Sequence, residues 1–334
     1  MKDITLLDSI DSLNDKEWDN LIDRSPNGNC FLRSAWLRCV EEGMGLSALH
    51  VVCHSEGKLE AVFPNFIEKS NSSFNISSLP MGYGGLAAPN MDTECLPAII
   101  DKLQEICLKK GVSHKICMYT DKSVGYWCIL RDNDYSPHYA CSFRNDLSKG
   151  LDYNFRLLDD ANKRLLRHHY DNFNFETSQI SEDNLNDFYI SYSRSSIESG
   201  ERPIKMSFFE SLLDNCSENV VINTVSNKDG YVGGKLRILD NSKNIIHGLL
   251  VGLEKKYESD HLNFLTDWHT MEWGIRNRYG IIDWGHTADD LRNERFKRHY
   301  GIGGTVVPTI TWEKSYGHLN PLICLYNKIK SKAI

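Results

Sequence analysis

The strongest constraint on the fold of this 334-residue chain is an internal repeat. In "FLRSAW", Ser34 has the character of an N-cap residue before a predicted helix over 35–42. In "IKMSFF", Ser207 has the same relation to a predicted helix over 208–215. The two serines are 173 positions apart (207 − 34).

Two further features recur in the same order. A tight turn at Glu56-Gly57 between predicted strands returns at Asp229-Gly230, again 173 positions later (230 − 57). An amphipathic helix closed by Gly111 precedes the strand "HKICMY", and a second one closed by Gly280 precedes "IIDWG", with an offset of 169 (280 − 111). The sequence therefore predicts two copies of one unit.

Each copy reads as helix, antiparallel strands, helix and strand, which is an α+β unit. We place the first domain at residues 1–148 and the second at 149–334, since the polar segment 144–152 gives way there to a charged helix. The alternative is a pair of unrelated α+β domains.

Composition limits the function. The net charge of -7 argues against a dedicated DNA-binding protein, because such proteins need clustered Lys and Arg. The ten cysteines include no C-x-x-C pair, which is typical of reduced thiols and predicts no zinc finger or other metal site. The N-terminus lacks a signal peptide, and no apolar run reaches about 18 residues, so we expect a soluble cytoplasmic protein.

Two glycine-bearing segments are candidate binding surfaces. The loop "SLPMGYGGLAAPN" places Gly82, Gly84 and Gly85 around Tyr83, which suits either an extended substrate or a tight packing turn. In the second copy, "GYVGGKLRIL" carries two glycines within a strand pattern, which indicates a bulge. The next strand contains His247, a candidate base or a structural histidine.

A third candidate region begins at Asp283-Trp284-Gly285. Thr287 and Asp290 have the spacing of a capping box, so a helix is predicted to follow. Arg295 and Lys297 belong to a basic cluster on this helix that could hold a phosphate, although such a cluster is also typical of a solvated face.

These residues resemble a known family. The strand ending in "DWG" and the helix ending in "FKRHYG", from Phe296 to Gly301, are similar to the closing signature of Fem-type peptidyltransferases and FemAB-like acyltransferases. Trp18 with "CFLRSAW" resembles the opening of that family, and "GYGGL" resembles its first-domain substrate loop. Trp284 stands where the family usually has Phe.

The resemblance implies two tandem GNAT-like (acyl-CoA N-acyltransferase) domains, each a mixed, mainly antiparallel sheet flanked by helices. It implies transfer of an acyl group to an amine of a cell-envelope glycan or cell-wall precursor, by direct attack in a ternary complex. No tightly bound cofactor is expected, and the donor would be acyl-CoA or, alternatively, aminoacyl-tRNA. A lipid- or nucleotide-linked precursor, tRNA and the inner membrane face, through the tail 320–334, are the possible partners.

We predict roles for the residues on this basis. Lys297 would stabilise a phosphate or oxyanion and Asp283 would orient the reacting groups, while His247 and Glu254 compete with Asp283 as the base. The residues predicted to contact substrate are Gly82, Tyr83, Gly84, Gly85, Arg295 and Phe296. The pyrophosphate signature of GNAT proteins is not evident in either half, which supports a further alternative, a non-catalytic scaffold that binds a glycan or a partner.

Overall fold

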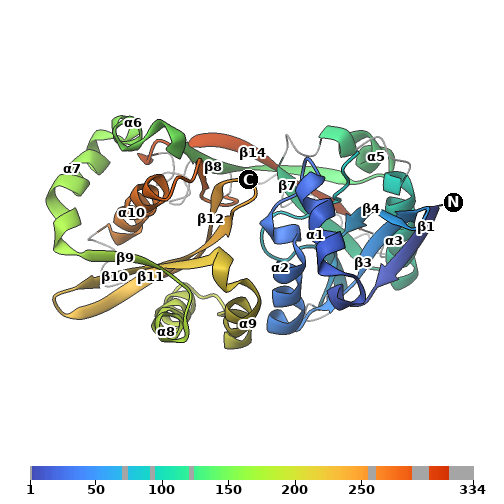
Figure 1. Cartoon of the computed structure of the whole chain (residues 1–334), viewed down its shortest axis with the longest axis horizontal. Coiled ribbons are helices and arrows are strands. Elements are labelled where there is room, and N and C mark those ends of the chain that lie inside the picture. Colours follow the sequence, from blue (N-terminus) through green and yellow to red (C-terminus); the bar gives the residue numbers. More distant parts are fainter. Residues whose placement is uncertain are drawn as a thin grey trace, which may run out of the picture.

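The computed structural model describes residues 2–69, 74–90, 95–119, 124–254, 261–287 and 301–315. Two lobes lie side by side, and long strands connect them (Figure 1). The predicted Thr287–Asp290 capping box and the tail 320–334 lie wholly or partly outside the described residues.

The first part of the chain supplies eight strands and four of the described α-helices. The strands are β1 (Lys2–Leu7), β2 (Ser47–Ala48), β3 (His50–Ser55), β4 (Lys58–Phe63), β5 (Phe66–Lys69), β6 (Phe74–Ser78), β7 (Ser113–Tyr119) and β8 (Ser136–Asp146). The helices are α1 (Asp15–Arg24), α2 (Ser34–Arg38), α3 (Cys95–Lys110) and α5 (Trp127–Asp132), with α2 running on into the π-helical turn η3 (Cys39–Gly43).

The second part repeats this order after two connecting helices, α6 (Leu151–Leu157) and α7 (Asp160–His169). Its strands are β9 (Asn174–Gln179), β10 (Val220–Asn227), β11 (Gly230–Asp240), β12 (Ile245–Leu253), β13 (Ile281–Asp283) and β14 (Thr305–Lys314). Its helices are α8 (Glu182–Glu198), α9 (Met206–Cys216) and α10 (Leu262–Arg276).

A single eleven-stranded sheet runs through both lobes, in the order β2-β5-β6-β7-β14-β8-β13-β12-β11-β10-β9. A separate three-stranded sheet, β1-β3-β4, covers the far end of the first lobe. Most neighbours are antiparallel, and the pairs β6–β7 and β12–β13 are parallel. This is the mixed, mainly antiparallel architecture that was predicted for each copy.

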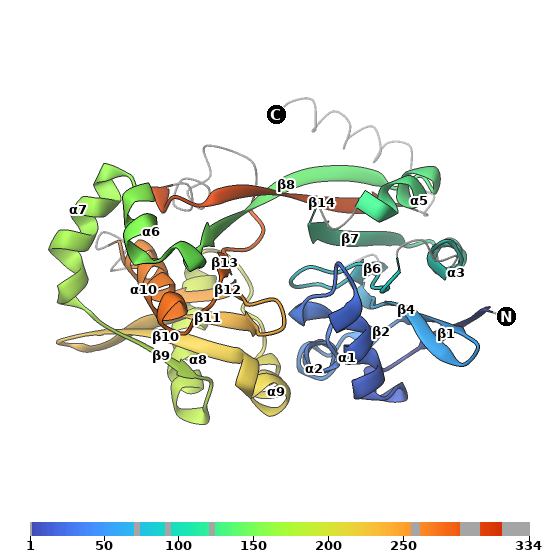
Figure 2. The ribbon, with the colours of Figure 1, turned by 45° about the horizontal axis from the view of Figure 1, so that its top comes forward.

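The two copies exchange their last strands at the centre of the sheet. β14 comes from the end of the chain but pairs with β7 of the first lobe, and β8 pairs with β13 of the second (Figure 2). β8 and β14 also pair with each other, and Ala140 faces Thr309 there. These two residues are 169 positions apart (309 − 140), so equivalent positions of the repeat meet at the centre of the molecule.

A second contact between the lobes joins η3 to α9. Ser207 Oγ donates to Gly43 O at 2.7 Å, and a Cβ on Gly43 would lie 2.5 Å from Phe208 Cα, so glycine is required for this approach. One buried apolar cluster draws on both lobes, with Trp18, Phe31 and Phe208 among its members.

Some local predictions were wrong by one or a few residues. Ser34 and Ser207 are the first and second residues of their helices, and the N-caps are Arg33 and Lys205. The second hairpin turns at residues 228–229, one position earlier than predicted, because Asn227 pairs with Gly230. α10 ends before Gly280, and the left-handed residue after it is Arg278.

Residues 144–146 of the polar segment 144–152 complete β8 inside the sheet. One broader expectation differs from the structure. The cysteines are not all reduced, since Cys53 and Cys95 form a disulfide between β3 and the start of α3.

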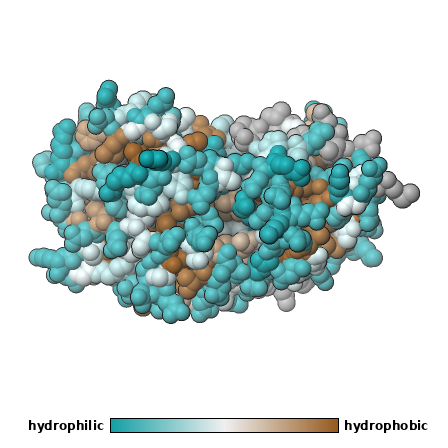
Figure 3. Space-filling model, in the orientation of Figure 1, coloured by the Kyte–Doolittle hydropathy of each residue, from teal (hydrophilic) through white to brown (hydrophobic). Residues whose placement is uncertain are grey.

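The surface is mixed in character. Hydrophilic residues predominate on the face in Figure 3, and the apolar residues gather in separate patches. Leu151, Tyr153 and Leu157 of α6 are among the exposed large apolar side chains. In the described part of the chain, no helix combines the length and apolar character needed to cross a bilayer.

Candidate functional site

A buried carboxylate lies where the two lobes meet. Asp283 is the last residue of β13 and is fully buried. Five groups donate hydrogen bonds to its two oxygens: Ser142 Oγ (2.7 Å), Arg144 Nε (2.7 Å), Tyr119 OH (2.7 Å), Gly285 N (2.8 Å) and Tyr83 OH (3.3 Å). The donors come from β7, β8, the glycine loop and the turn after β13, so this side chain connects both lobes.

The charges in this network are fixed by its surroundings. Burial alone would raise the pKa of Asp283, but its interactions with His247 and Arg144 and the hydrogen bond from Tyr119 lower that pKa below its usual value. Burial and the Asp283 charge raise the pKa of both Tyr83 and Tyr119, so the two phenols stay neutral donors. A carboxylate with five donors is suited to orient its neighbours and poorly suited to accept a proton.

The glycine loop brings Tyr83 to this carboxylate. The rings of Tyr83 and Tyr119 stack with centroids 3.9 Å apart, and the Arg144 guanidinium lies 4.1 Å from the Tyr119 centroid. Close packing explains the glycines: a Cβ on Gly84 would meet Ser78 O at 1.9 Å, and one on Gly82 would meet the Phe31 ring at 2.5 Å. The structure thus uses the loop for packing, and its predicted contact with substrate stays a prediction.

The same loop closes a gap in the first lobe. β6 and β7 pair in parallel as far as Ser78 and Ile116. After β6, the glycine loop turns back and lies beside β7. Gly84 N donates to Cys117 O at 2.8 Å, and Gly85 N donates to Ser78 Oγ at 2.8 Å. The space past the last parallel pair is therefore filled by the lobe's own backbone.

No described residue fills the equivalent place in the second lobe. β12 and β13 pair only from Ile245–Ile281 to His247–Asp283, after which Trp284 N donates to Phe143 O and the chain follows β8. β12 continues to Leu253 without a described partner on that side. We call the space between residues 248–251 and Trp284 the notch. It is part of a pocket of about 690 Å³ that also reaches α8 and α10.

Basic side chains line the notch. Lys235 Nζ and Arg237 Nη2 both donate to Asp267 Oδ1, at 2.6 and 2.7 Å. All three side chains are buried, and the exposed Glu201 lines the same pocket. The Arg237 guanidinium also lies 5.4 Å from the Trp284 ring. A polarised group that reaches Lys235 and Arg237 would meet cationic N–H donors.

The other predicted base candidates lie apart from the carboxylate network or at its edge. His247 is paired in register with Asp283, and its ring meets those of Phe31 and Tyr83 at centroid distances of 5.0 and 6.3 Å. Burial lowers the pKa of His247, which favours the neutral imidazole, although the charges of Asp283 and Asp240 act in the opposite direction. Glu254 follows β12 and accepts from Arg194 Nη1 at 3.1 Å.

The remaining predicted site residues lie outside the described part of the chain. Arg295, Phe296 and Lys297 lie in the undescribed segment 288–300, so the basic helix stays a prediction. The exchange of the family's Phe for Trp284 has a local reason, because the indole Nε1 donates to Asn145 Oδ1 at 2.7 Å.

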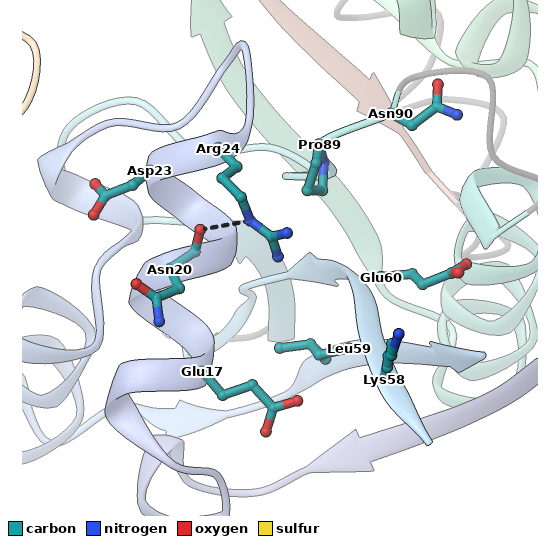
Figure 4. Close-up of a pocket in the computed structure, with 9 residues that line it drawn as sticks. All are labelled: Glu17, Asn20, Asp23, Arg24, Lys58, Leu59, Glu60, Pro89 and Asn90. Atoms are coloured by element: carbon teal, nitrogen blue, oxygen red, sulfur yellow. Dashed lines mark hydrogen bonds between the residues drawn. The ribbon is translucent and has the colours of Figure 1, made fainter. Parts of the chain in front are cut away.

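A second pocket of about 750 Å³, lined by several charged side chains, lies at the far end of the glycine loop (Figure 4). Its walls are α1, the start of β4, and Pro89 and Asn90. Three acidic and two basic side chains line it: Glu17, Asp23, Glu60, Arg24 and Lys58. Such a lining suits a polar or amine-bearing ligand better than an acyl chain.

Sequence reasoning missed the residues that complete these sites. Arg144, Tyr119 and Ser142 gave no motif, although a lone arginine inside the strand pattern "ACSFRND" is a usable signal. Lys235 and Arg237 alternate in "GGKLRIL", which places two cations on one face of a strand that is otherwise apolar.

Comparisons with known proteins agree with this geometry. Residues 155–298 match the family of acetyltransferase (GNAT) domains. No curated protein matches the chain in sequence. Solved structures resemble nearly all of it, and "Crystal structure of FemX" describes one with a TM-score of 0.68 at 12% identity, covering 94% of this chain and 98% of FemX.

Two other solved structures cover the chain equally well. A tandem GNAT protein from the clavulanic acid biosynthesis pathway has a TM-score of 0.63 at 10% identity, covering 95% of this chain and 99% of its own. The C-terminal domain of a putative lysylphosphatidylglycerol synthetase from Agrobacterium fabrum has a TM-score of 0.60 at 11% identity, with coverages of 94% and 95%. At such identities the likeness concerns the fold.

Proposed function

The chain has a FemAB-like fold of two GNAT-like domains in tandem, and from this premise we propose that it is an N-acyltransferase whose acyl donor binds in the notch of the second lobe. The observation that carries the proposal is the difference between the lobes. The first lobe fills its gap with Gly84 and Gly85, whereas the second keeps a pocket of about 690 Å³ in the same place.

The lining of the notch supports binding of an extended donor. The outer half of β12 presents backbone groups toward Trp284, so a donor with amide groups could add to this strand edge. Lys235 and Arg237 line the same pocket, and in this proposal they stabilise the negative charge that the carbonyl oxygen gains during attack by an amine.

Asp283 has an orienting role in this proposal. Its five hydrogen bonds hold Tyr83, Arg144 and the Gly285 backbone, and Gly285 directly follows Trp284 of the notch. Glu254, at the outer end of β12, has a partly accessible side chain and is the base candidate that we favour. Transfer would proceed by direct attack of the amine on the acyl carbonyl.

The acceptor class follows from the resemblance to Fem-type enzymes: an amine of a cell-envelope glycan or cell-wall precursor. The polar pocket beside Pro89 and Asn90 has a net acidic lining that could hold an amine-bearing sugar or peptide. We propose Lys297 and Arg295 as phosphate contacts for the donor or for a lipid- or nucleotide-linked acceptor.

The test is a thermal-shift screen of acyl-CoAs, free CoA and aminoacyl-tRNAs. A bound donor raises the melting temperature by mass action. Ser195→Trp, on the α8 wall of the notch, should abolish the shift, while Ile190→Trp, on the exposed face of the same helix, should keep it. A shift with aminoacyl-tRNA alone would favour the peptidyltransferase alternative. If no donor shifts the wild-type protein, the chain is a scaffold and the proposal is wrong.

A further inference from the structure

Three side chains of types that can bind metal ions converge at the edge of the carboxylate network. Cys30, Asp240 and His247 each offer one ligand atom, and these atoms all lie within 4.8 Å of one another. Cys30 belongs to the first lobe, Asp240 ends β11, and His247 lies in β12. All three residues are buried.

The unpaired nitrogens of the buried His247 ring indicate a ligand. Its exposure is 2%, and neither Nδ1 nor Nε2 has a hydrogen-bond partner. Leaving a buried polar group unpaired is costly, so native structures rarely do so without a water, an ion or a functional reason. Hydrophobic packing against Phe31 explains the position of the ring but satisfies neither nitrogen.

The register of β11 and β12 places the Asp240 carboxylate on the same side of the sheet as His247. Asp240 pairs with Ile245 and Ile238 pairs with His247, so the Asp240 and His247 side chains share one face of the sheet. Asp240 Oδ1 accepts from Ser242 Oγ at 2.8 Å and from Lys243 N at 3.1 Å, and Oδ2 accepts from Cys30 N at 2.9 Å. Such outer hydrogen bonds are what holds a metal-ligating carboxylate in position.

The cluster is reachable from solvent. A cavity of about 270 Å³ is lined by Cys30 and Asp240, together with Arg33, Cys216 and residues 241–242. It is large enough for several waters and gives an ion a path to the thiol and the carboxylate.

We propose that Cys30, Asp240 and His247 bind a zinc ion, with a water from this cavity as the fourth ligand. Sulfur, imidazole nitrogen and carboxylate oxygen are all zinc ligands, and bonds of about 2.0–2.3 Å require ligand atoms about 3.3–3.6 Å apart. The ligand atoms therefore need to approach one another by at most about 1.5 Å. Binding forms Zn–S, Zn–N and Zn–O bonds, and the Cys30 thiol proton leaves to solvent.

Zinc binding would balance the charges of the three ligands and would give the His247 ring a partner. The thiolate and the carboxylate together neutralise Zn²⁺, and the neutral imidazole gains the partner that it lacks. Because Cys30 comes from one lobe and the other two ligands from the other, the ion would tie the lobes together. His247 is then a ligand and not the base of the transfer reaction.

Metal content tests the site directly. We expect protein produced with added zinc and dialysed in metal-free buffer to hold about one zinc per chain by mass spectrometry. Cys30→Ala and His247→Gln should lose it. Cys107→Ala, at another buried free cysteine, is the matched control and should keep it. A zinc-free wild type, or zinc retained by both ligand variants, overturns the proposal.

Two further measurements keep the proposal testable if one variant fails to fold. Cobalt(II) should give a thiolate charge-transfer absorption and tetrahedral ligand-field bands in the wild type and in Cys107→Ala. Asp240→Asn should weaken both. Zinc should also raise the melting temperature of the wild type. Cobalt spectra without a thiolate band, or a melting temperature that zinc leaves unchanged, contradict the assignment.

Discussion

Tyr83 and Asp283 are 200 positions apart in the sequence, yet the Tyr83 hydroxyl donates to Asp283 Oδ1 at 3.3 Å in the buried centre of the molecule. The first residue belongs to a loop of the first lobe, and the second ends a strand of the second lobe. Their contact makes the carboxylate network a property of the whole chain, and the network can be tested residue by residue.

Asp283→Asn should strongly destabilise the protein. The substitution keeps the shape but removes the charge that faces Arg144, and breaking a buried ion pair typically costs about 3–5 kcal/mol. Urea denaturation measures the change. Asp132→Asn, which breaks the exposed Arg131–Asp132 pair, should have little effect. Equal denaturation midpoints for Asp283→Asn and the wild type would contradict the role of the network.

The two tyrosines should contribute unequally. Tyr119 OH lies 2.7 Å from Asp283 Oδ2, whereas Tyr83 OH lies 3.3 Å from Oδ1. A hydrogen bond to a charged group is worth about 1.5–3 kcal/mol, so Tyr119→Phe should lower the unfolding free energy by about that amount and Tyr83→Phe by less. Both variants keep the stacked rings, so the reverse order in chemical denaturation would contradict a larger contribution from the shorter hydrogen bond of Tyr119.

Gly84→Ala should disrupt the glycine loop. An added Cβ would lie 1.9 Å from Ser78 O, so the backbone that fills the first-lobe gap must move. Gly45→Ala is the control: its Cβ meets nothing within 4 Å, and only its positive φ of 65° adds strain, about 1–2 kcal/mol. We expect a larger drop in melting temperature for Gly84→Ala. A smaller drop would mean that the loop accommodates the methyl group.

Acid should destabilise the protein through buried histidines. Burial lowers the pKa of His114 to about 3, below the unfolded value of about 6.5. The stability from the neutral ring is therefore fully present above pH 6.5 and is lost as the pH falls toward 3, at up to about 1.4 kcal/mol per pH unit. His269, with a pKa of about 4 that burial and Arg276 lower, adds to the same trend.

The variant His114→Gln isolates this effect. Between pH 6 and 4, the unfolding free energy of this variant should fall less steeply than that of the wild type. The difference in slope should be up to about 1.4 kcal/mol per pH unit, which corresponds to one proton. His168→Gln, at an exposed position of α7, should keep the wild-type slope. Identical slopes in all three proteins would assign the acid sensitivity to other groups.

The sequence predicted what depends on local pattern. The offset of 169 to 173 positions located the equivalent helices and hairpins, because turn residues and apolar periodicity are short-range signals. It also singled out Tyr83, His247 and Asp283 from three separate segments. The structure brings these three residues to one place.

The partners of these residues could not be predicted. Arg144 reaches Asp283 across 139 positions and Tyr119 across 164, and both contacts depend on which strands become neighbours at the centre of the sheet. A repeat read from one sequence predicts two equal units and gives no reason for them to exchange β8 and β14. The meeting of Cys30 with Asp240 and His247 follows from the same packing of lobe on lobe.

The position of β14 also sets the order in which the molecule can be completed. During synthesis, β7 emerges almost 200 residues before the strand that covers its edge, since Thr309 pairs with Tyr119 (309 − 119 = 190). Until β14 pairs with it, β7 has an unpaired strand edge that could associate with other chains. We therefore expect the first lobe to complete its sheet only after β14, at the end of the chain, has been synthesised and has paired with β7.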